Sequence, residues 1–371
     1  MTETRAAVVH PGTGTFVWET VRLEAPRPDE VLVRIVAAGI CHTDLAVRDG
    51  KLHTPLPAVL GHEGAGVVEA IGSGVTRVAA GDKVLLSFSS CGRCGACEHG
   101  HPGYCDTFIA RNFGGARPDG STPVHRVDGT PLGGRFFGQS SFAHHAVVDE
   151  RSVVPVVAAD EDELALLAPI GCGVQTGAGA VFNELRPGPG DLVAVFGAGA
   201  VGLSAVMAAA STPAARVVAV DIVPSRLDLA REMGATDVVN GAEEDVAARL
   251  KEITAGRGVT HALESSGVPA LLRQAVDSLA VRGTAAVVGA PPVGTDGTFD
   301  VNFLLNGRVV RGVTEGDSDL LDFVPTLVGL HRAGRLPFDR MIRFYPSDRI
   351  NEAAADAASG KVVKPVLRIP A

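Results

Sequence analysis

Four cysteines lie within a stretch of fifteen residues, and this cluster constrains the fold more than any other feature of the sequence. They follow the spacing Cys-x2-Cys-x2-Cys-x7-Cys, at Cys91, Cys94, Cys97 and Cys105. Four thiolates at such short spacing suit a structural zinc ion whose tetrahedral coordination is closed to solvent. We therefore expect this segment to be a loop wrapped around its metal, since it has no apolar core of its own.

The two other cysteines lie far apart in the sequence. Cys41 opens the run Cys-His-Thr-Asp, and Cys172 stands in Gly-Cys-Gly. His62, in Gly-His-Glu-Gly, offers an imidazole. Two thiolates and one imidazole would leave a fourth zinc position open for water or substrate, which is typical of a catalytic site. The residues by themselves also allow three ordinary core side chains.

Length and charge narrow the classes of protein. A chain of 371 residues predicts about two domains. The net charge of -9, with no cluster of Lys or Arg, argues against a nucleic-acid or membrane partner and favours a small-molecule enzyme. The first residues do not resemble a secretory signal, so we expect a cytoplasmic protein. Thiols stay reduced there, which favours metal binding over disulfides.

The pattern of apolar residues changes along the chain. Residues 1–173 are expected to be mainly β, with strands at 31–38 and 64–71. Residues 174–314 alternate strand and helix, which predicts a parallel sheet covered on both faces. The expected strands of this second domain are 192–196, 217–221, 238–240, 260–264 and 284–289. Residues 315–371 are expected to return to the first domain.

A glycine motif follows the first of these strands. Gly197, Gly199 and Gly202 form Gly-x-Gly-x-x-Gly before an expected helix. This context favours a dinucleotide site, because the glycines allow a tight turn and let a pyrophosphate approach the helix start. Asp221 ends the next strand, where a carboxylate would bind the adenosine ribose and repel a 2'-phosphate. We therefore predict NAD over NADP, although Arg226 is a nearby cation that could accept a phosphate.

Taken together, these motifs resemble the zinc-containing alcohol dehydrogenases of the medium-chain dehydrogenase/reductase superfamily, and they occur in the order typical of that family. The runs 110–115 and 137–142 are most similar to bacterial NAD-dependent aryl-alcohol (benzyl-alcohol) dehydrogenases. The resemblance implies an α/β fold, with a Rossmann doubly wound parallel sheet domain and a mainly β GroES-like catalytic domain that carries a structural zinc lobe. It implies two zinc ions per chain, one catalytic and one structural.

The resemblance also assigns roles to single residues. Cys41, His62 and Cys172 would be the catalytic zinc ligands, with Asp44 and Glu63 behind them. Glu63 is an alternative ligand, since some relatives use the glutamate after the histidine. Thr43 would accept the substrate proton. The remaining matches concern the cofactor, with Val201 and Thr176 near the nicotinamide, and His42 and Lys364 at the pyrophosphate.

One position departs from the family pattern, because Ala46 stands where many members have the histidine that ends the proton relay. His42, His53 or water would then complete the route to solvent. The stretch 117–133 resembles the insertion of dimeric members, which implies a homodimer, with a tetramer as the alternative.

The expected reaction is reversible oxidation of an alcohol to an aldehyde, with hydride transfer to NAD. Five phenylalanines after the zinc lobe suit an aryl or allylic alcohol, although core packing would also explain them. They are Phe108, Phe113, Phe136, Phe137 and Phe142. Two alternatives are a glutathione-dependent formaldehyde dehydrogenase and a non-catalytic, zinc-stabilised NAD-binding sensor.

Overall fold

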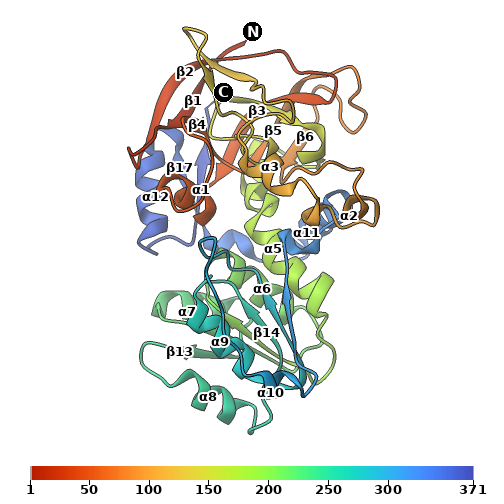
Figure 1. Ribbon diagram of the computed structural model, residues 1–371, viewed down its shortest axis with the longest axis vertical. Helices are drawn as coiled ribbons and strands as arrows, with labels where there is room; N and C mark the ends of the chain where they lie inside the picture. Colours follow the sequence, from red (N-terminus) through yellow and green to blue (C-terminus); the bar gives the residue numbers. More distant parts are fainter. Residues whose placement is uncertain (1, 371) are drawn as a thin grey trace. The chain divides into compact units, whose positions relative to one another are not determined.

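The structure is a computed structural model that describes residues 2–370, and these residues divide into two compact units (Figure 1). Unit 2 comprises Gly173–Ser318 and Gly329–Met341, and unit 1 comprises the rest of the described chain. The segment 329–341 therefore belongs to unit 2, whereas the sequence predicts that all of 315–371 returns to the first domain. One contact that ties this segment to unit 2 is a hydrogen bond from the Arg335 guanidinium to the Ser211 carbonyl oxygen, at 2.7 Å.

Unit 1 is built on two sheets. The five-stranded sheet has the order β4-β1-β2-β7-β8. Its strands are β1 (Thr2–Val9), β2 (Phe16–Leu23), β4 (Ala58–Val59), β7 (Val124–Arg126) and β8 (Pro131–Leu132). The seven-stranded sheet has the order β10-β6-β5-β3-β18-β17, with β9 also paired to β3. Its strands are β3 (Glu30–Gly39), β5 (Glu63–Ile71), β6 (Lys83–Leu86), β9 (His145–Asp149), β10 (Val153–Pro155), β17 (Ile342–Pro346) and β18 (Lys364–Arg368).

Short helices lie between these strands. They are α1 (His42–Arg48), α2 (Gly95–Glu98), α3 (Phe108–Phe113), α4 (Glu161–Leu167) and α12 (Ile350–Ala358), with 3-10 turns that include η1 (Pro102–Tyr104), η2 (Phe136–Gly138) and η4 (Ala168–Gly171). The long helix α11 (Leu320–Arg332) runs from unit 1 into unit 2.

Unit 2 contains one six-stranded sheet with the order β13-β12-β11-β14-β15-β16, and every pairing in it is parallel. Its strands are β11 (Leu192–Phe196), β12 (Arg216–Asp221), β13 (Asp237–Asn240), β14 (Val259–Glu264), β15 (Leu279–Val287) and β16 (Val309–Gly312). This is the 3-2-1-4-5-6 order of a dinucleotide-binding sheet, in which ligands bind beyond the carboxyl ends of the strands. The expected Rossmann fold is confirmed.

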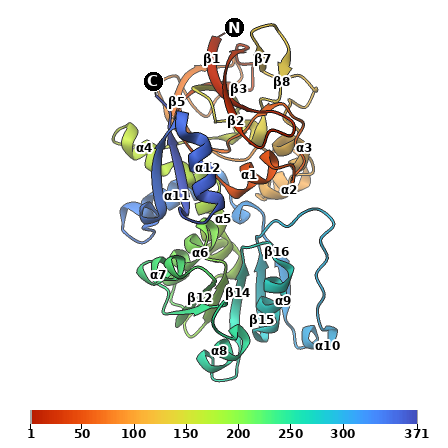
Figure 2. The ribbon, with the colours of Figure 1, turned by 90° about the vertical axis from the view of Figure 1, so that its left-hand side faces the viewer.

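Helices cover both faces of this sheet. They are α5 (Gly173–Gly179), α6 (Ala200–Ala210), α7 (Pro224–Glu232), α8 (Val246–Ile253), α9 (Pro269–Asp277) and α10 (Val301–Leu304). Figure 2 shows α6 and α7 on one side of the sheet and α9 on the other. Every second residue of a strand points to the same face of the sheet. On one face, side chains such as Ala194, Phe196 and Val218 pack against apolar residues of α8 and α9.

The uncharged run 192–210 folds as strand β11, a turn and helix α6. Within residues 2–370, no single helix is long and apolar enough to cross a membrane. One bent pair of helical segments, Glu161–Gly171 and Gly173–Leu185, would be long and apolar enough together, by length and composition alone.

Candidate functional site

Four potential metal ligands from separate parts of the sequence meet inside unit 1. Cys41 precedes helix α1, His62 precedes strand β5, and Cys172 follows the turn η4. Their sulfur and nitrogen atoms, with a carboxylate oxygen of Glu63, all lie within 4.8 Å of one another. A hydrogen bond with Cys172 lowers the pKa of Cys41 well below its usual range, which favours the thiolate that metals bind.

The His62 ring is fully buried, and its two nitrogen atoms differ. Nδ1 lies 2.9 Å from Asp44 Oδ1, and because a carboxylate only accepts, this nitrogen carries the proton. Nε2 has no hydrogen-bond partner among the described residues. A buried ring nitrogen without a partner is costly unless an unseen group binds it. The donor set therefore fits a zinc ion held by two sulfurs and this nitrogen.

Asp44 joins two of the ligand-bearing segments. Besides the ring of His62, its carboxylate accepts hydrogen bonds from the backbone N–H groups of Cys41, at 2.9 Å, and Gly61, at 3.1 Å. Burial by itself lowers the pKa of His62, but Asp44 and Cys41 together outweigh it and raise that pKa. Asp44 therefore fixes the orientation of the ring and makes Nε2 a stronger donor to a metal.

A buried amide joins His62 to a neighbouring strand end. Gln139 Nε2 donates to the carbonyl oxygens of His62 and Ser87, both at 2.9 Å, and its Oε1 accepts from Gly64 N–H at 3.1 Å. The Ser87 hydroxyl in turn donates to the carbonyl oxygen of Gly171, next to Cys172, at 2.6 Å. This role of Gln139 has no local signal in the sequence, because its partners are all distant along the chain.

Glu63 is bound by a buried lysine. Lys364 Nζ lies 2.8 Å and 2.9 Å from the two carboxylate oxygens of Glu63, and both side chains are almost fully buried. Burial by itself lowers the pKa of Lys364, but the Glu63 carboxylate raises it, so the ammonium stays charged. The resemblance implies a pyrophosphate contact for Lys364. In the structure its ammonium instead neutralises Glu63, because a buried carboxylate needs a partner of opposite charge.

Phenylalanine rings surround His62. The ring of Phe137 stacks on the imidazole, with centroids 4.5 Å apart, and Phe136 meets it edge-on at 5.5 Å. Phe113 and Phe108 pack against Phe137, at 5.1 Å and 6.5 Å. Phe142 is separate, because its ring packs on Phe16 instead. Four of the five expected phenylalanines therefore form one aromatic cluster beside the potential zinc ligands.

The residues expected in the proton relay lie on helix α1. Thr43 Oγ1 is 3.8 Å from Cys41 Sγ, so its hydroxyl lies beside the cysteine ligand. His42 is exposed, as is His53, whereas Ala46 is buried. Ala46 therefore offers no relay group on this helix. Among the described residues of α1, the Thr43 hydroxyl is the polar group that lies beside the Cys41 thiol.

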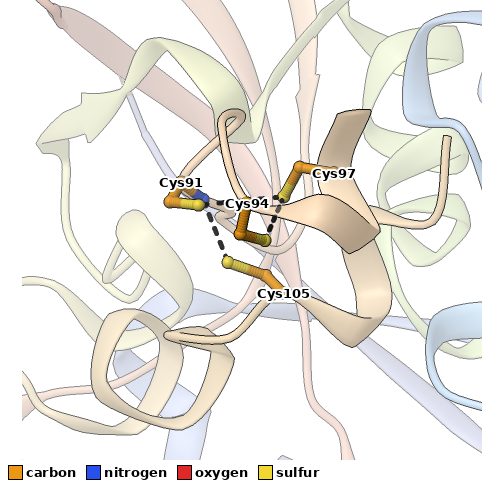
Figure 3. Close-up of side chains that lie close together, drawn as sticks. All are labelled: Cys91, Cys94, Cys97 and Cys105. Carbon is orange, nitrogen blue, oxygen red and sulfur yellow. Dashed lines mark hydrogen bonds between the residues drawn. The ribbon is translucent and has the colours of Figure 1, made fainter. Parts of the chain in front are cut away.

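The four clustered cysteines converge as expected (Figure 3). Their sulfur atoms lie within 4.8 Å of one another, and the Sγ atoms of Cys94 and Cys97 are 3.5 Å apart. The backbone N–H of Arg93 lowers the pKa of Cys91, whereas burial raises that of Cys97 to about 11. Four facing thiols without any other ligand fit a closed, structural zinc site.

In unit 2, the glycine motif forms the turn between β11 and α6. Gly197 has φ +94°, which side chains rarely adopt, and a Cβ on Gly202 would lie 1.7 Å from the Gly197 carbonyl oxygen. Gly199 caps α6, and the space that its Cβ would occupy has no neighbour within 4 Å. This open cradle beside free helix N–H groups fits a pyrophosphate. Val201 lies in the first turn of α6, and Thr176 is buried in α5.

Asp221 lies at the carboxyl end of β12, as expected. Its Oδ2 accepts from Ala198 N–H at 2.6 Å, and its Oδ1 from Ile222 N–H at 2.8 Å. Arg226 Nη1 is 4.0 Å from Oδ2, and its buried Nε has no partner in the described chain. The carboxylate is thus held beside the glycine turn, with one arginine next to it.

Two sequence families match this chain. An alcohol dehydrogenase GroES-like domain matches residues 27–158, and a zinc-binding dehydrogenase domain matches residues 200–328. Geraniol dehydrogenase of Castellaniella defragrans is 45% identical over 367 residues, which is 98% of this chain and 97% of the relative.

Two solved structures are similar over the whole length of both chains. Benzyl alcohol dehydrogenase from Acinetobacter calcoaceticus is 46% identical, with a TM-score of 0.95. An alcohol dehydrogenase zinc-binding domain protein from Burkholderia ambifaria is 54% identical, with a TM-score of 0.97.

Proposed function

This chain belongs to the zinc-containing medium-chain alcohol dehydrogenases, and we propose that it oxidises primary aryl and allylic alcohols to aldehydes with NAD as hydride acceptor. The observation that carries this proposal is the partnerless, buried Nε2 of His62 beside two cysteines and under a phenylalanine ring. Two similar proteins named for a benzyl and an allylic alcohol support the substrate class.

Cys41, His62 and Cys172 would hold the catalytic zinc, and the four clustered cysteines a second one. Zinc, when bound, supplies a Lewis acid that lowers the pKa of an alcohol hydroxyl. Glu63 remains with Lys364, since releasing its carboxylate to a metal would leave a buried ammonium without a partner. The structural arrangement thus favours Cys172 over Glu63 as the third ligand.

The chain's own residues would position the alcohol and remove its proton. The Thr43 hydroxyl, beside Cys41, would accept the hydroxyl proton, and the exposed His42 on the same helix would pass it to solvent. The aromatic cluster around His62, in which Phe137 is almost fully buried, would give the alcohol apolar surroundings that suit an aryl or allylic group. The carbinol carbon would then give its hydride to the nicotinamide, which leaves an aldehyde.

The choice of NAD rests on Asp221. Its carboxylate is held at the end of β12 by backbone N–H groups, where it would bind the two ribose hydroxyls. A 2'-phosphate would meet the same negative charge. Arg226 would offset only part of this repulsion, since its guanidinium already lies close to the Asp221 carboxylate.

The decisive assay follows NADH absorbance with purified protein of known zinc content. Benzyl alcohol, geraniol, ethanol and formaldehyde with glutathione are compared, each with NAD and with NADP. We expect the highest kcat/KM for benzyl alcohol or geraniol with NAD, at about two zinc ions per chain. A requirement for glutathione would instead favour the formaldehyde dehydrogenase, and no turnover of any alcohol at full zinc would favour the non-catalytic sensor.

The expected homodimer is a further part of the proposal. Strand β16 is an edge strand of the parallel sheet, and all four of its residues are exposed. Leu305, just before it, is 77% exposed, and Val293 is 99% exposed. An uncovered apolar edge of this kind favours pairing with a second copy. Sedimentation equilibrium should give twice the mass of one chain, and a monomer would refute the pairing.

A further inference from the structure

Unit 1 has a cavity that the proposed reaction does not use. Its volume is about 770 Å³, and it is lined by residues of β1, β2, β17 and β18, by residues that directly follow β17 and β18, and by His144. None of the potential zinc ligands lines it, nor do Asp44, Thr43 or Phe137. The volume lies in the range of small-molecule sites.

Aromatic rings form the walls of this cavity. Trp18 meets the His144 ring edge-on, with centroids 5.6 Å apart. Trp18 is held in place because its indole N–H donates to the Ser347 carbonyl oxygen at 2.9 Å. Phe344 contributes a further ring from β17. A flat apolar ligand would therefore find faces on which to stack.

Two arginines lie against these rings. The Arg5 guanidinium is 5.7 Å from the centre of the Trp18 ring, and that of Arg368 is 4.3 Å from the centre of the Phe344 ring. Arg368 also pairs with the exposed carboxylate of Asp162, whereas no carboxylate of residues 2–370 lies within ion-pair distance of Arg5. Asp348 is the only acidic residue among the lining residues.

We propose that this cavity, the Trp18 cavity, binds an aromatic carboxylate. The ring of such a ligand would pack against Trp18 and Phe344, and its carboxylate would pair with Arg5 and Arg368. A guanidinium stacked on an aromatic ring is pre-organised for a carboxylate, because its planar donors stay directed and partly shielded from water. The charge of the lining also suits an anion. Although the whole chain has a net charge of -9, two arginines and one aspartate line this cavity.

An aromatic carboxylate is what further oxidation of an aryl aldehyde by a separate oxidising enzyme would yield. This link to the reaction rests on the proposed function, whereas the binding itself does not. The ligand class is therefore defined by the cavity, and its source by the chemistry proposed for the zinc site.

The cavity has a built-in reporter, because Trp18 is the only tryptophan of the sequence. The zinc-loaded protein is titrated with sodium benzoate at constant ionic strength, and its tryptophan fluorescence is recorded. We expect a saturable change. Cyclohexanecarboxylate, which has the charge without the aromatic ring, should bind more weakly, and benzyl alcohol, which has the ring without the charge, should give no saturable change.

Two variants and a matched control test the assigned cations. Arg5→Gln and Arg368→Gln should each raise the dissociation constant of benzoate by about tenfold, the usual effect of losing one charge-assisted hydrogen bond. Arg22→Gln changes another arginine of unit 1, on the same strand as Trp18 but outside the lining residues, and should leave the constant unchanged.

The proposal is overturned if benzoate gives no saturable change, or if the same constant is found in Arg5→Gln, Arg368→Gln and the parent protein. Competitive inhibition of alcohol oxidation without a fluorescence change would place benzoate at the zinc site and would also overturn it. Benzyl alcohol oxidation is measured on the same samples. If benzoate does not bind but benzyl alcohol is oxidised normally, only the cavity proposal fails. If benzyl alcohol is not oxidised, the proposed function fails.

Discussion

At the scale of single residues, Asp44 has the most consequential contacts, since its carboxylate accepts from His62 and from two backbone N–H groups. Asp44→Asn keeps the shape of the side chain but offers only one oxygen. The His62 ring would lose its orientation and part of its basicity. We expect zinc affinity or kcat/KM to fall by about tenfold to a hundredfold. Competition with a chelator measures the affinity, and initial rates measure kcat/KM.

Asp49→Asn is the matched control for this prediction. Asp49 follows the same helix, but it is exposed and pairs with Arg48. Its substitution should leave zinc affinity and turnover unchanged. Equal zinc affinity and equal kcat/KM in Asp44→Asn and the parent protein would contradict the positioning role of Asp44.

Phe137 gives a second prediction at this scale, because its ring lies directly on the imidazole of His62. Phe137→Leu keeps an apolar side chain and removes the aromatic face. The KM for benzyl alcohol should rise by about threefold to tenfold, the value of one aromatic contact, with little change for ethanol. Phe142→Leu, whose ring packs on Phe16, should not alter this ratio of KM values. An equal rise for both alcohols would argue against a role in selectivity.

At the scale of elements, regular spacing made much of the molecule predictable. The parallel strands from β11 to β14 lie close to their expected ranges, because buried strands leave apolar runs between turn residues. Strand β15 begins at Leu279, well before its expected start at residue 284. β16 was missed, since all of its residues are exposed and its sequence has no buried run. The Glu63–Lys364 pair could not be predicted either, because 301 residues separate its members and only the folded sheet brings them together.

The four-cysteine lobe is a separate element with a testable role. Cys94→Ser removes one of four converging ligands. We expect zinc content to fall from about two ions to about one per chain, and the melting temperature to fall by about 5 °C or more, because the lobe has no apolar core of its own. Arg93→Ser, at an exposed neighbouring position, is the control. Retention of both zinc ions in Cys94→Ser would contradict the ligand assignment.

At the scale of the whole molecule, a buried ionic network joins distant parts of unit 1. Glu30, at the start of β3, accepts two hydrogen bonds from Arg117, at 2.7 Å and 2.8 Å, and one from Arg135, at 3.1 Å. Arg135 also binds Asp149, at the end of β9. Burial by itself raises the pKa of Glu30, but the Arg117 guanidinium and then Arg135 outweigh it and hold the pKa below its usual 4.5.

This network predicts a pH-dependent contribution to stability. A carboxyl group whose pKa is lower in the folded than in the unfolded state stabilises the fold fully above its unfolded pKa of about 4.5, and this contribution is lost as the pH falls through the folded value. Glu30→Gln should therefore lower the free energy of unfolding by about 3–5 kcal/mol near neutral pH, because two buried arginines lose their shared partner. The difference from the parent protein should shrink below about pH 4.5.

Denaturant unfolding across this pH range tests the prediction. Glu161→Gln, which removes an exposed pair with Arg34, should have an effect of less than about 1 kcal/mol. A loss of stability in Glu30→Gln that stays constant from neutral to acidic pH would show that the contribution of Glu30 is not that of its charge.

The hydrogen bonds of Asp44, Gln139 and Ser87 have a consequence for how the protein acquires its metal. They join the segments that carry Cys41, His62 and Cys172, and they involve protein atoms alone. Little conformational entropy then remains to be lost when an ion arrives. Zinc could thus be removed and replaced, or exchanged for a spectroscopically visible ion such as cobalt, without refolding of the chain around it.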